Sequence, residues 1–526
     1  MDMNAAEREK VINLEELRAE YEKRISLRDE EIAILREQIR SLKHHLFGSK
    51  SEKLHPEVTT QQPSLFELEQ PADLEEEGDP GKEDEEKVTA TRRKKPRGRK
   101  KLPDWLPRKQ VVHDLSEEDK VCRCGCTKTH IGADRSEVLE KTPAQVHVIE
   151  HLRLKYACKN PDCPIAMEGE PGAVQIAPAP LRMIPKSMAG HSLLAHVLNA
   201  KFTDWLPFYR VEKQLRREHV LIPRQTMSRW AVKVAHAFKP MWALMLADVK
   251  KHPYLQIDET TVQVLNEPGR KNTTKSYMWV IRGGPPERPM VLFKYHPSRA
   301  AHVARDLLEG FKGVVQTDGY EGYSFLDQEN SGFIHAGCLN HARRKFATIA
   351  KISGRRKKGY THKALGLFAK LYRVERKARE ENLDPRALVE RRQRDSKPLM
   401  EQLHGLLRDI HGRTPPAGML GTAVDYALKQ WPKLGVFLGN GLIKLDTNDV
   451  ENAIRPFVCG RKAWMFSGHP DGAEASAILY SMVETAKASG WDPYRWMVHV
   501  FDRLPAATSE NEIRALLPNT PPVPEK

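Results

Sequence analysis

Three acidic residues stand where carboxylates could hold divalent metal ions. Asp258 and Asp318 each end a short run rich in apolar and β-branched residues, which starts at Tyr254 and at Gly313 and is predicted to be a buried β-strand. Glu451 lies in a segment predicted to begin a helix. A buried aspartate is unfavourable unless it is paired or binds a metal. We therefore expect the three acids to converge on Mg²⁺ or Mn²⁺.

Two such ions, about 3.5–4 Å apart, can activate an attacking oxygen and stabilise the leaving oxygen of a phosphodiester. In this hypothesis Asp258 bridges both ions, Asp318 binds one of them and Glu451 binds the other. The alternative is structural: Glu451 could pair with Arg455 four residues later on one helix, and Asp318-Gly319 could be a plain turn.

The segments around the acids predict an RNase H-like sheet. We expect, in this order, two strands (275–281 and 288–295), a helix (300–308), a strand that follows Asp318 (333–338) and a basic helix from His341. The basic, mostly helical stretch of about 350–441 interrupts this core before Glu451 and is interpreted as an insertion.

The N-terminal segment shows a heptad repeat between about Leu14 and Leu46. Apolar residues fill the two core positions of the repeat, which are Ile25, Ile32, Ile39 and Leu46 for one and Leu14, Tyr21, Leu35 and Leu42 for the other. The pattern predicts a coiled coil that joins copies of the chain into a homo-oligomer. The alternative is a lone amphipathic helix packed on its own domain.

A Pro-, Glu- and Asp-rich stretch to about Lys87 is predicted to be a disordered linker, and the dense basic run 92–101 follows it. Arg97 and Arg99 flank a glycine and could lie in a minor groove of DNA. We favour the alternative, a solvated tail that contacts phosphates without reading sequence.

Five of the seven cysteines cluster in one short region: Cys122, Cys124, Cys126, Cys158 and Cys163. Four thiolates on two knuckles separated by a short sheet can bind one structural Zn²⁺ tetrahedrally. The spacing does not say which of the first three cysteines take part. The alternative is a set of reduced cysteines without metal.

The stretch from Ser187 to about Leu246 has helical periodicity. A turn near Pro223 separates two helices and gives the pattern of a helix-turn-helix. Its second helix would present to DNA a set of polar residues, which are Arg224, Gln225, Ser228 and Arg229. The alternative is an ordinary helical hairpin.

The 526-residue chain is too long for one core, and its formal charge of +15 favours a nucleic acid partner. No apolar run approaches the length of a membrane span, so we expect a cytoplasmic protein without a membrane partner. The expected fold is multidomain α+β. Its parts are the coiled coil (1–54), the linker with the basic run (55–103), the zinc-binding region (104–180), the helix-turn-helix-like domain (181–250), the catalytic core (251–460) and a C-terminal helical region (461–526).

Several motifs together resemble the IS66-type insertion-sequence transposases, a family with an Asp-Asp-Glu triad. The matching stretches cover nearly the whole chain: Phe47-Gly48 with Ser51-Glu52-Lys53-Leu54, Lys155-Tyr156-Ala157-Cys158, Leu206-Pro207 with Tyr209-Arg210, Asp258-Glu259-Thr260, Asp318-Gly319-Tyr320, His341-Ala342-Arg343-Arg344-Lys345-Phe346, and Gly460-Arg461-Lys462 with Trp464 and Phe466. The chain departs from the family pattern at Thr447, at Asn452 and in the tight spacing of the first cysteine knuckle.

The resemblance implies that Asp258, Asp318 and Glu451 are catalytic in cleaving the ends of an insertion sequence and joining them to target DNA. It implies a bacterial, nucleoid-associated protein that binds double-stranded DNA and works with accessory proteins of the same element. Contacts to the DNA backbone are expected from Arg343, Arg344, Arg455, Arg461 and Lys462; the alternative for these residues is a set of surface ion pairs. The alternatives are a DNA-binding protein with a decayed catalytic centre and a nuclease of the same fold that cleaves without joining.

Overall fold

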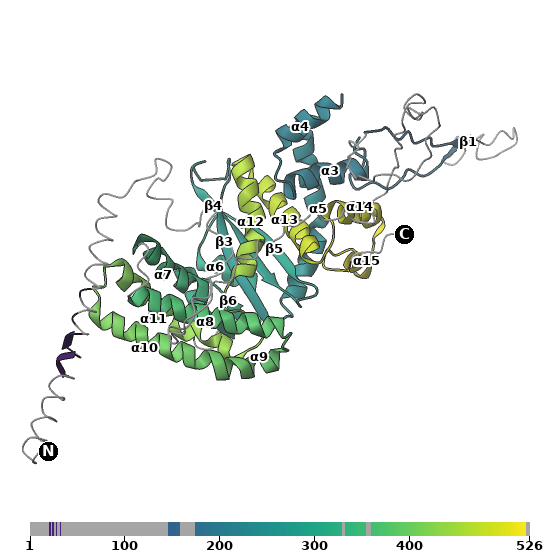
Figure 1. Ribbon diagram of the computed structural model, residues 1–526. Coiled ribbons are helices and arrows are strands. Elements are labelled where there is room, and N and C mark those ends of the chain that lie inside the picture. The colour runs from purple at the N-terminus through teal and green to yellow at the C-terminus, as the bar shows by residue number, and fades with distance from the viewer. Residues whose placement is uncertain are drawn as a thin grey trace, which may run out of the picture. The chain divides into compact units, whose positions relative to one another are not determined.

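The computed structural model describes residues 146–157, 174–328, 332–353 and 359–521, with isolated positions between 20 and 32 (Figure 1). The five predicted zinc ligands, Arg97, Arg99 and most of the predicted coiled coil lie outside the described residues. Contacts divide the chain into one unit of residues 50–152 and a second unit made of the rest. The fold below belongs to the second unit.

The centre of the fold is a five-stranded mixed sheet with the strand order β5-β4-β3-β6-β7. An antiparallel meander forms half of it, and two parallel strands extend it on the side of β3. The strands are β3 (Tyr254–Gln263), β4 (Lys275–Gly283), β5 (Met290–His296), β6 (Gly313–Gln316) and β7 (Phe333–Ala336). Helix α6 (Ala301–Leu308) connects β5 to β6, so the predicted order of strands and helix is confirmed.

The prediction that Asp258 ends its strand is wrong. β3 continues to Gln263, because β4 pairs with it along its length, from Leu255 opposite Gly283 to Gln263 opposite Lys275. The parallel partner β6 is shorter and pairs with β3 only as far as Gln256. Asp258 therefore lies within β3 but just beyond the end of the β3–β6 ladder.

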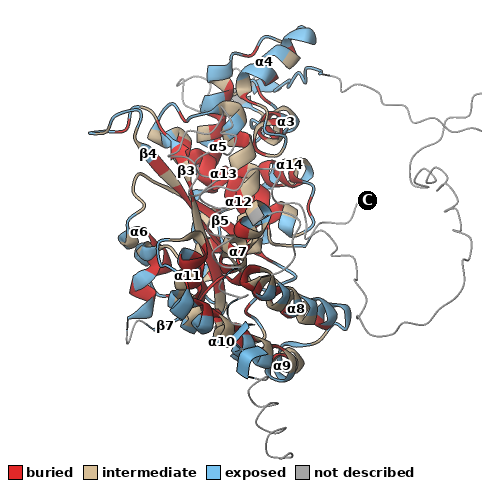
Figure 2. Ribbon diagram, turned by 60° about the vertical axis from the view of Figure 1, so that its left-hand side comes forward, coloured by how far each residue is buried: buried red, intermediate tan, exposed pale blue. Residues whose placement is uncertain are grey.

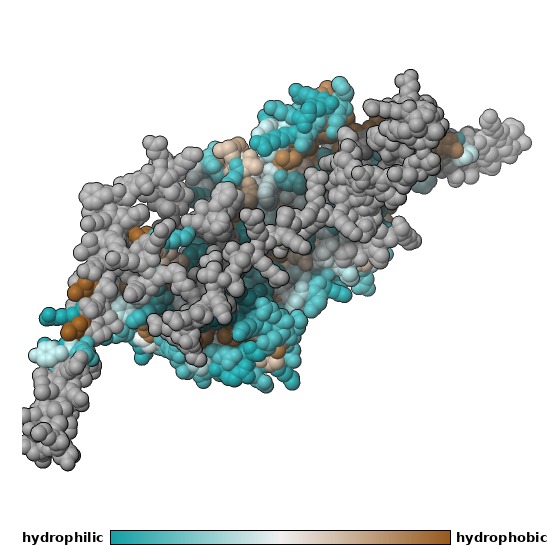
Figure 3. All heavy atoms as spheres, viewed as in Figure 1, coloured by the Kyte–Doolittle hydropathy of each residue, from teal (hydrophilic) through white to brown (hydrophobic). Residues whose placement is uncertain are grey.

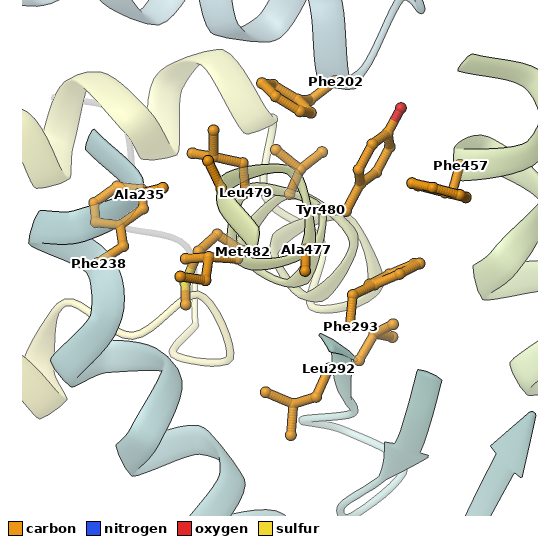
Figure 4. Close-up of a cluster of buried hydrophobic side chains, with 14 of the residues drawn as sticks. Phe202, Ala235, Phe238, Leu292, Phe293, Phe457, Ala477, Leu479, Tyr480 and Met482 are labelled. Carbon is orange, nitrogen blue, oxygen red and sulfur yellow. The ribbon is translucent and has the colours of Figure 1, made fainter. Parts of the chain in front are cut away.

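One hydrophobic core lies between the meander and a group of helices around α13, which is buried along most of its length (Figure 2). This group consists of α13 (Pro470–Ala488) and the helices around it, which are α3 (His191–Phe202), α5 (Arg224–Val249), α12 (Asn448–Trp464) and α14 (Pro493–Arg503). Figure 4 looks along α13, with Phe202 of α3, Phe238 of α5, Phe457 of α12 and Phe293 of β5 arranged around it.

The exposed edge of the sheet at β5 is closed by hydroxyl groups of α13. Thr485 Oγ1 accepts a hydrogen bond from the amide of Val291 at 2.9 Å and donates to its carbonyl at 3.0 Å. One turn earlier, Ser481 Oγ accepts from the amide of Phe293 at 2.8 Å. These bonds satisfy backbone groups of an edge strand that no further strand pairs, and so they fix α13 on the sheet.

A second helical layer with its own core covers the β6–β7 side. It consists of α7 (Leu339–Ser353), α8 (Tyr360–Glu380), α9 (Pro385–Arg391), the π-helix Arg392–Ser396, α10 (Lys397–Arg413) and α11 (Met419–Leu434). Hydrophilic residues dominate the lower side of the view in Figure 3, where α8 to α10 lie in Figure 1. The side chain of Arg392 is buried here, paired with Glu375 at 2.7 Å and donating to three backbone carbonyls.

The remaining elements are short or lie at the margins of the two layers. They are β1 (Lys155–Ala157), β2 (Val174–Ile176), α4 (Phe208–Arg217), α15 (Glu510–Ala515) and the 3₁₀ helices Glu321–Asp327, Val436–Gly439 and Leu504–Ala506. Strands β1 and β2 pair antiparallel with each other. No helix in the described part of the chain is long and apolar enough to cross a membrane.

Candidate functional site

The strand register places Asp258 and Asp318 next to each other. Gln256 of β3 lies opposite Gln316 of β6, and each acid follows its glutamine by two residues. Successive side chains alternate between the two faces of a strand, so each glutamine predicts the face on which its acid lies. Because the ladder ends at this pair, the two carboxylates emerge together at the end of β6.

The turn after Asp318 is held from both sides. The amide of Tyr320 donates to Asp318 Oδ1 at 3.0 Å, and the ring of Tyr426 from α11 closes over Gly319. A Cβ atom at residue 319 would lie 2.6 Å from the Tyr426 hydroxyl. Any other residue at 319 would force the Tyr426 ring to move, and this contact brings the insertion helices up to the acid cluster.

Two buried glutamines attach the start of α12, and with it Glu451, to the sheet. Gln256 Nε2 donates to the carbonyl of Asp446 at 3.0 Å, and its Oε1 accepts from the amide of Val450 at 3.0 Å. Gln316 Nε2 donates to the carbonyl of Lys444 at 2.8 Å, and the two glutamine side chains bond each other at 3.0 Å. Sequence reasoning missed both residues, although the repeated Gln-x-Asp spacing was a visible signal.

Glu451 lies in the first turn of α12 and is held by α7 and by its own helix. Arg344 Nη2 lies 3.2 Å from Glu451 Oε2, and Thr447 Oγ1 donates to Oε1 at 3.2 Å. Thr447, which departs from the family pattern, thus contacts the acid directly. No ion pair between Glu451 and Arg455 is present in the part of the chain that the structure describes, so the structural alternative of that pairing is not supported.

The residue after Asp258 is an acid that the chain itself neutralises. The Glu259 side chain is only 1% exposed, and Arg299 Nε donates to it at 2.6 Å. The hydroxyl of Tyr323 donates to its other oxygen. Burial raises the pKa of Glu259, while Arg299 opposes the rise. Glu259 is therefore a fixed support beneath the cluster.

Asp258 differs from its neighbour because no arginine or lysine of the described residues pairs with it. Burial raises the pKa of Asp258 well above its usual value, and the negative charges of Glu259, Asp318 and Glu451 raise it further. Nearby His341 opposes this rise. Carboxylates that converge around Asp258 and disfavour its ionised form have the charge and donor types that a divalent ion requires.

A thiol and an imidazole adjoin the third acid, and sequence reasoning did not assign them a role in the site. Cys338, His341 and Glu451 each offer one ligand atom, and these atoms lie within 4.8 Å of one another. Burial alone would lower the pKa of His341, but Cys338, Glu451 and Asp318 raise it to about 9. By donor type this group could also hold a metal ion.

The residues predicted to bind DNA fall into three groups. Four of them are exposed at the start of α5: Arg224, Gln225, Ser228 and Arg229. Met227 and Trp230 of the same helix are buried, so the four polar residues lie on its exposed side. Arg344 pairs with Glu451 of the site, whereas Arg461 Nη1 donates to Thr261 Oγ1, further along β3, at 3.0 Å. Arg343 and Arg455 are half-buried and Lys462 is exposed.

Comparison with known proteins matches the chain to one family along most of its length. The family model described as "Transposase IS66 family" matches residues 186–475, and the model described as "IS66 C-terminal element" matches residues 481–519. Upstream, "Transposase C of IS166 homeodomain" matches 34–111, and "zinc-finger binding domain of transposase IS66" matches 119–160.

Similar chains occur in Sinorhizobium fredii (strain NBRC 101917 / NGR234). Uncharacterized protein y4jD is 34% identical over 79% of this chain and 81% of its own length. Uncharacterized protein y4qI is 31% identical over 93% of this chain and 89% of its own length. Because the first of these family models covers more than half of the chain and both relatives are more than 30% identical over most of it, the chain belongs to the IS66 transposase family.

Proposed function

We propose that this transposase cleaves the ends of its insertion sequence and joins them to target DNA at a centre formed by Asp258, Asp318 and Glu451. One observation carries the proposal: acids from β3, from the turn after β6 and from α12 meet in one cluster, where burial and then the negative charge of the other acids raise the pKa of Asp258. The meander with two parallel strands added beside β3 supports an RNase H-like core.

In this proposal the three carboxylates hold two Mg²⁺ or Mn²⁺ ions. Such ions, when bound, supply a polarised water or 3′-hydroxyl and stabilise the charge on the leaving oxygen. The chain contributes the position of each ligand: Gln256 and Gln316 hold the start of α12 on the sheet, and Arg344 and Thr447 orient Glu451. Glu259 with Arg299 supports the strand that carries Asp258.

The other parts of the chain would bring DNA and further subunits to this centre. Arg224, Gln225, Ser228 and Arg229 would contact DNA as the second helix of a helix-turn-helix, with Arg97 and Arg99 on phosphates. The match at 119–160 supports a structural Zn²⁺ site and contains four of the five predicted cysteine ligands. The heptad repeat supports a homo-oligomer, and accessory proteins of the same element would complete the assembly.

The test is cleavage and joining of labelled element-end DNA with Mg²⁺ or Mn²⁺ and the accessory proteins of the element. We expect wild type to give joined product and Asp258→Asn to give none while it still binds DNA. Asp306→Asn, a change of the same kind on the exposed side of α6, should keep activity. Equal activity of Asp258→Asn and wild type would remove Asp258 from the mechanism. Cleavage without joining by wild type would favour a nuclease.

A further inference from the structure

Two apolar side chains project into solvent at the C-terminal end of α12. Met465 is 68% exposed and Phe466 is 46% exposed, and together they form what we call the α12 tip. Large apolar side chains are individually common on surfaces, but two adjacent ones on a constrained turn are unusual. Their surroundings show what they would contact.

The backbone of the α12 tip is strained and firmly held. Met465 adopts φ 69° and ψ −52°, and the amide of Phe466 donates to the carbonyl of Trp464 at 2.9 Å, which closes a three-residue turn. This conformation is unfavourable for a residue with a side chain and persists only where the surroundings impose it. The structure therefore holds Met465 outward in spite of the strain.

Bonds on both sides impose this conformation. On the helix side, the amide of Met465 donates to the carbonyl of Arg461 at 2.7 Å. On the strand side, the amide of Ser467 donates to the carbonyl of Gln263 at 2.9 Å, and the amide of Leu265 donates to the carbonyl of Ser467 at 2.8 Å. The tip is thus a rigid projection braced against the end of β3.

Two exposed lysines lie near the α12 tip, and neither forms an ion pair with a carboxylate among the residues that the structure describes. Lys462 is exposed one turn earlier on α12, and Lys275 is exposed opposite Gln263 on β4. A third lysine, Lys201, is buried: its Nζ lies over the rings of Phe202, Phe208 and Trp464, and burial lowers its pKa to about 8. Apolar side chains flanked by exposed lysines without a carboxylate partner match a polyanion that has apolar surfaces between its charges, as stacked base pairs do.

Helix α12 and strand β3 both lead from the acid cluster toward the α12 tip, so their lengths give the distance between the acids and the tip. Fourteen residues of α12 separate Glu451 from Met465, which is about 21 Å at 1.5 Å per residue. Five residues of β3 separate Asp258 from Gln263, which is about 17 Å at 3.4 Å per residue. Because base pairs are about 3.4 Å apart, this separation corresponds to no more than about six base pairs along a duplex bound at the acids.

We infer that the α12 tip inserts between base pairs of the bound duplex DNA, within about six base pairs of the cleaved bond. Met465 enters the step, Phe466 stacks on an unstacked base, and Lys275 and Lys462 bind the flanking phosphates. Insertion of apolar side chains into a base step kinks the duplex. This inference rests on the proposed function, since it assumes that the acids act on DNA, but insertion is measured separately from cleavage.

The test uses the full-length protein and element-end duplexes that carry 2-aminopurine at single positions two to nine base pairs from the cleaved bond. Unstacking raises the fluorescence of this base, so wild type should raise it several-fold at one step within the reach of the tip. Met465→Ala/Phe466→Ala should abolish the rise and weaken binding roughly 10- to 100-fold. Met188→Ala removes a methionine that is 72% exposed elsewhere and should change neither quantity.

The salt dependence of binding distinguishes the roles of the tip residues. Lys462→Ala should reduce the slope of log Kd against log salt by about one, whereas the double apolar variant should leave it unchanged. A fluorescence rise that persists in the double variant, or no rise with wild type bound, would overturn insertion. A change of oligomeric state in the double variant with an unaltered fluorescence rise would assign the tip to a protein interface. Wild type that unstacks DNA without cleaving it would refute the proposed function and leave insertion standing.

Discussion

Replacing Gln256 by methionine should both destabilise the protein and displace Glu451. Methionine keeps the length and approximate volume of glutamine but lacks the amide. The carbonyl of Asp446 and the amide of Val450 would then lose partners at 3.0 Å each. A buried polar group without a partner costs about 1–3 kcal/mol, so we expect a loss of about 2–6 kcal/mol in the free energy of unfolding.

That loss can be measured by thermal unfolding, where about 2 °C per kcal/mol predicts a fall in Tm of about 4–12 °C. A displacement of Glu451 by about 1 Å would lower the cleavage rate about 100-fold while DNA affinity stays the same. The control is Gln263→Met on the same strand, since Gln263 is exposed and its side-chain amide donates to the carbonyl of Asn272. If Gln256→Met matched this control in Tm and cleavage rate, the glutamine would not position Glu451.

Further predictions concern the charge of the site and the edge of the sheet. The raised pKa of Asp258 means that the folded state holds its proton at pH values where the unfolded chain, with a pKa of about 3.9, has lost it. The Asp258 contribution to stability is therefore lost as pH rises from about 4 through the raised pKa, and in EDTA at neutral pH Asp258→Asn should have a higher Tm than wild type. Mg²⁺ or Mn²⁺ should stabilise wild type, more so at higher pH, and not Asp258→Asn; a metal shift of equal size in both proteins would contradict this. Thr485→Val should cost about 2–6 kcal/mol, because both backbone groups of Val291 lose their partner, whereas the exposed Thr422→Val should cost little. Chemical denaturation measures the stability of both variants. Equal denaturation midpoints for Thr485→Val and Thr422→Val would show that the α13 hydroxyls do not stabilise the edge of β5.

Periodicity and turn residues were enough to predict the order of the elements around the acids. The strand at Tyr254, the turn at Gly284, the helix that ends at Leu308 and the strand at Gly313 all depend on local preferences that the sequence displays. The predicted end of the first strand was wrong because strand length depends on the partner. β4 supplies hydrogen bonds beyond Asp258, and no local signal in the Asp258 segment shows this.

The sequence shows that the insertion is basic, but only the tertiary contacts show which of its arginines are buried or paired. The run at 391–394 looks like a cationic surface in sequence, but Arg392 is 1% exposed and supports the loop before α12 through Phe437, Asn440 and Ile443. Arg391 pairs with Glu381 at 2.6 Å. Charge read along a chain does not reveal which groups the fold neutralises.

The sequence by itself determined the family and the identity of the three candidate acids, because several motifs recur together over nearly its whole length. Only the tertiary structure decided how Asp258, Asp318 and Glu451 come together. The β3–β6 register aligns the first two, and Gln256 and Gln316 bring in the third from more than a hundred residues away. Local sequence cannot specify such convergence, because it depends on hydrogen bonds between buried side chains and backbone that exist only after the sheet and α12 have packed.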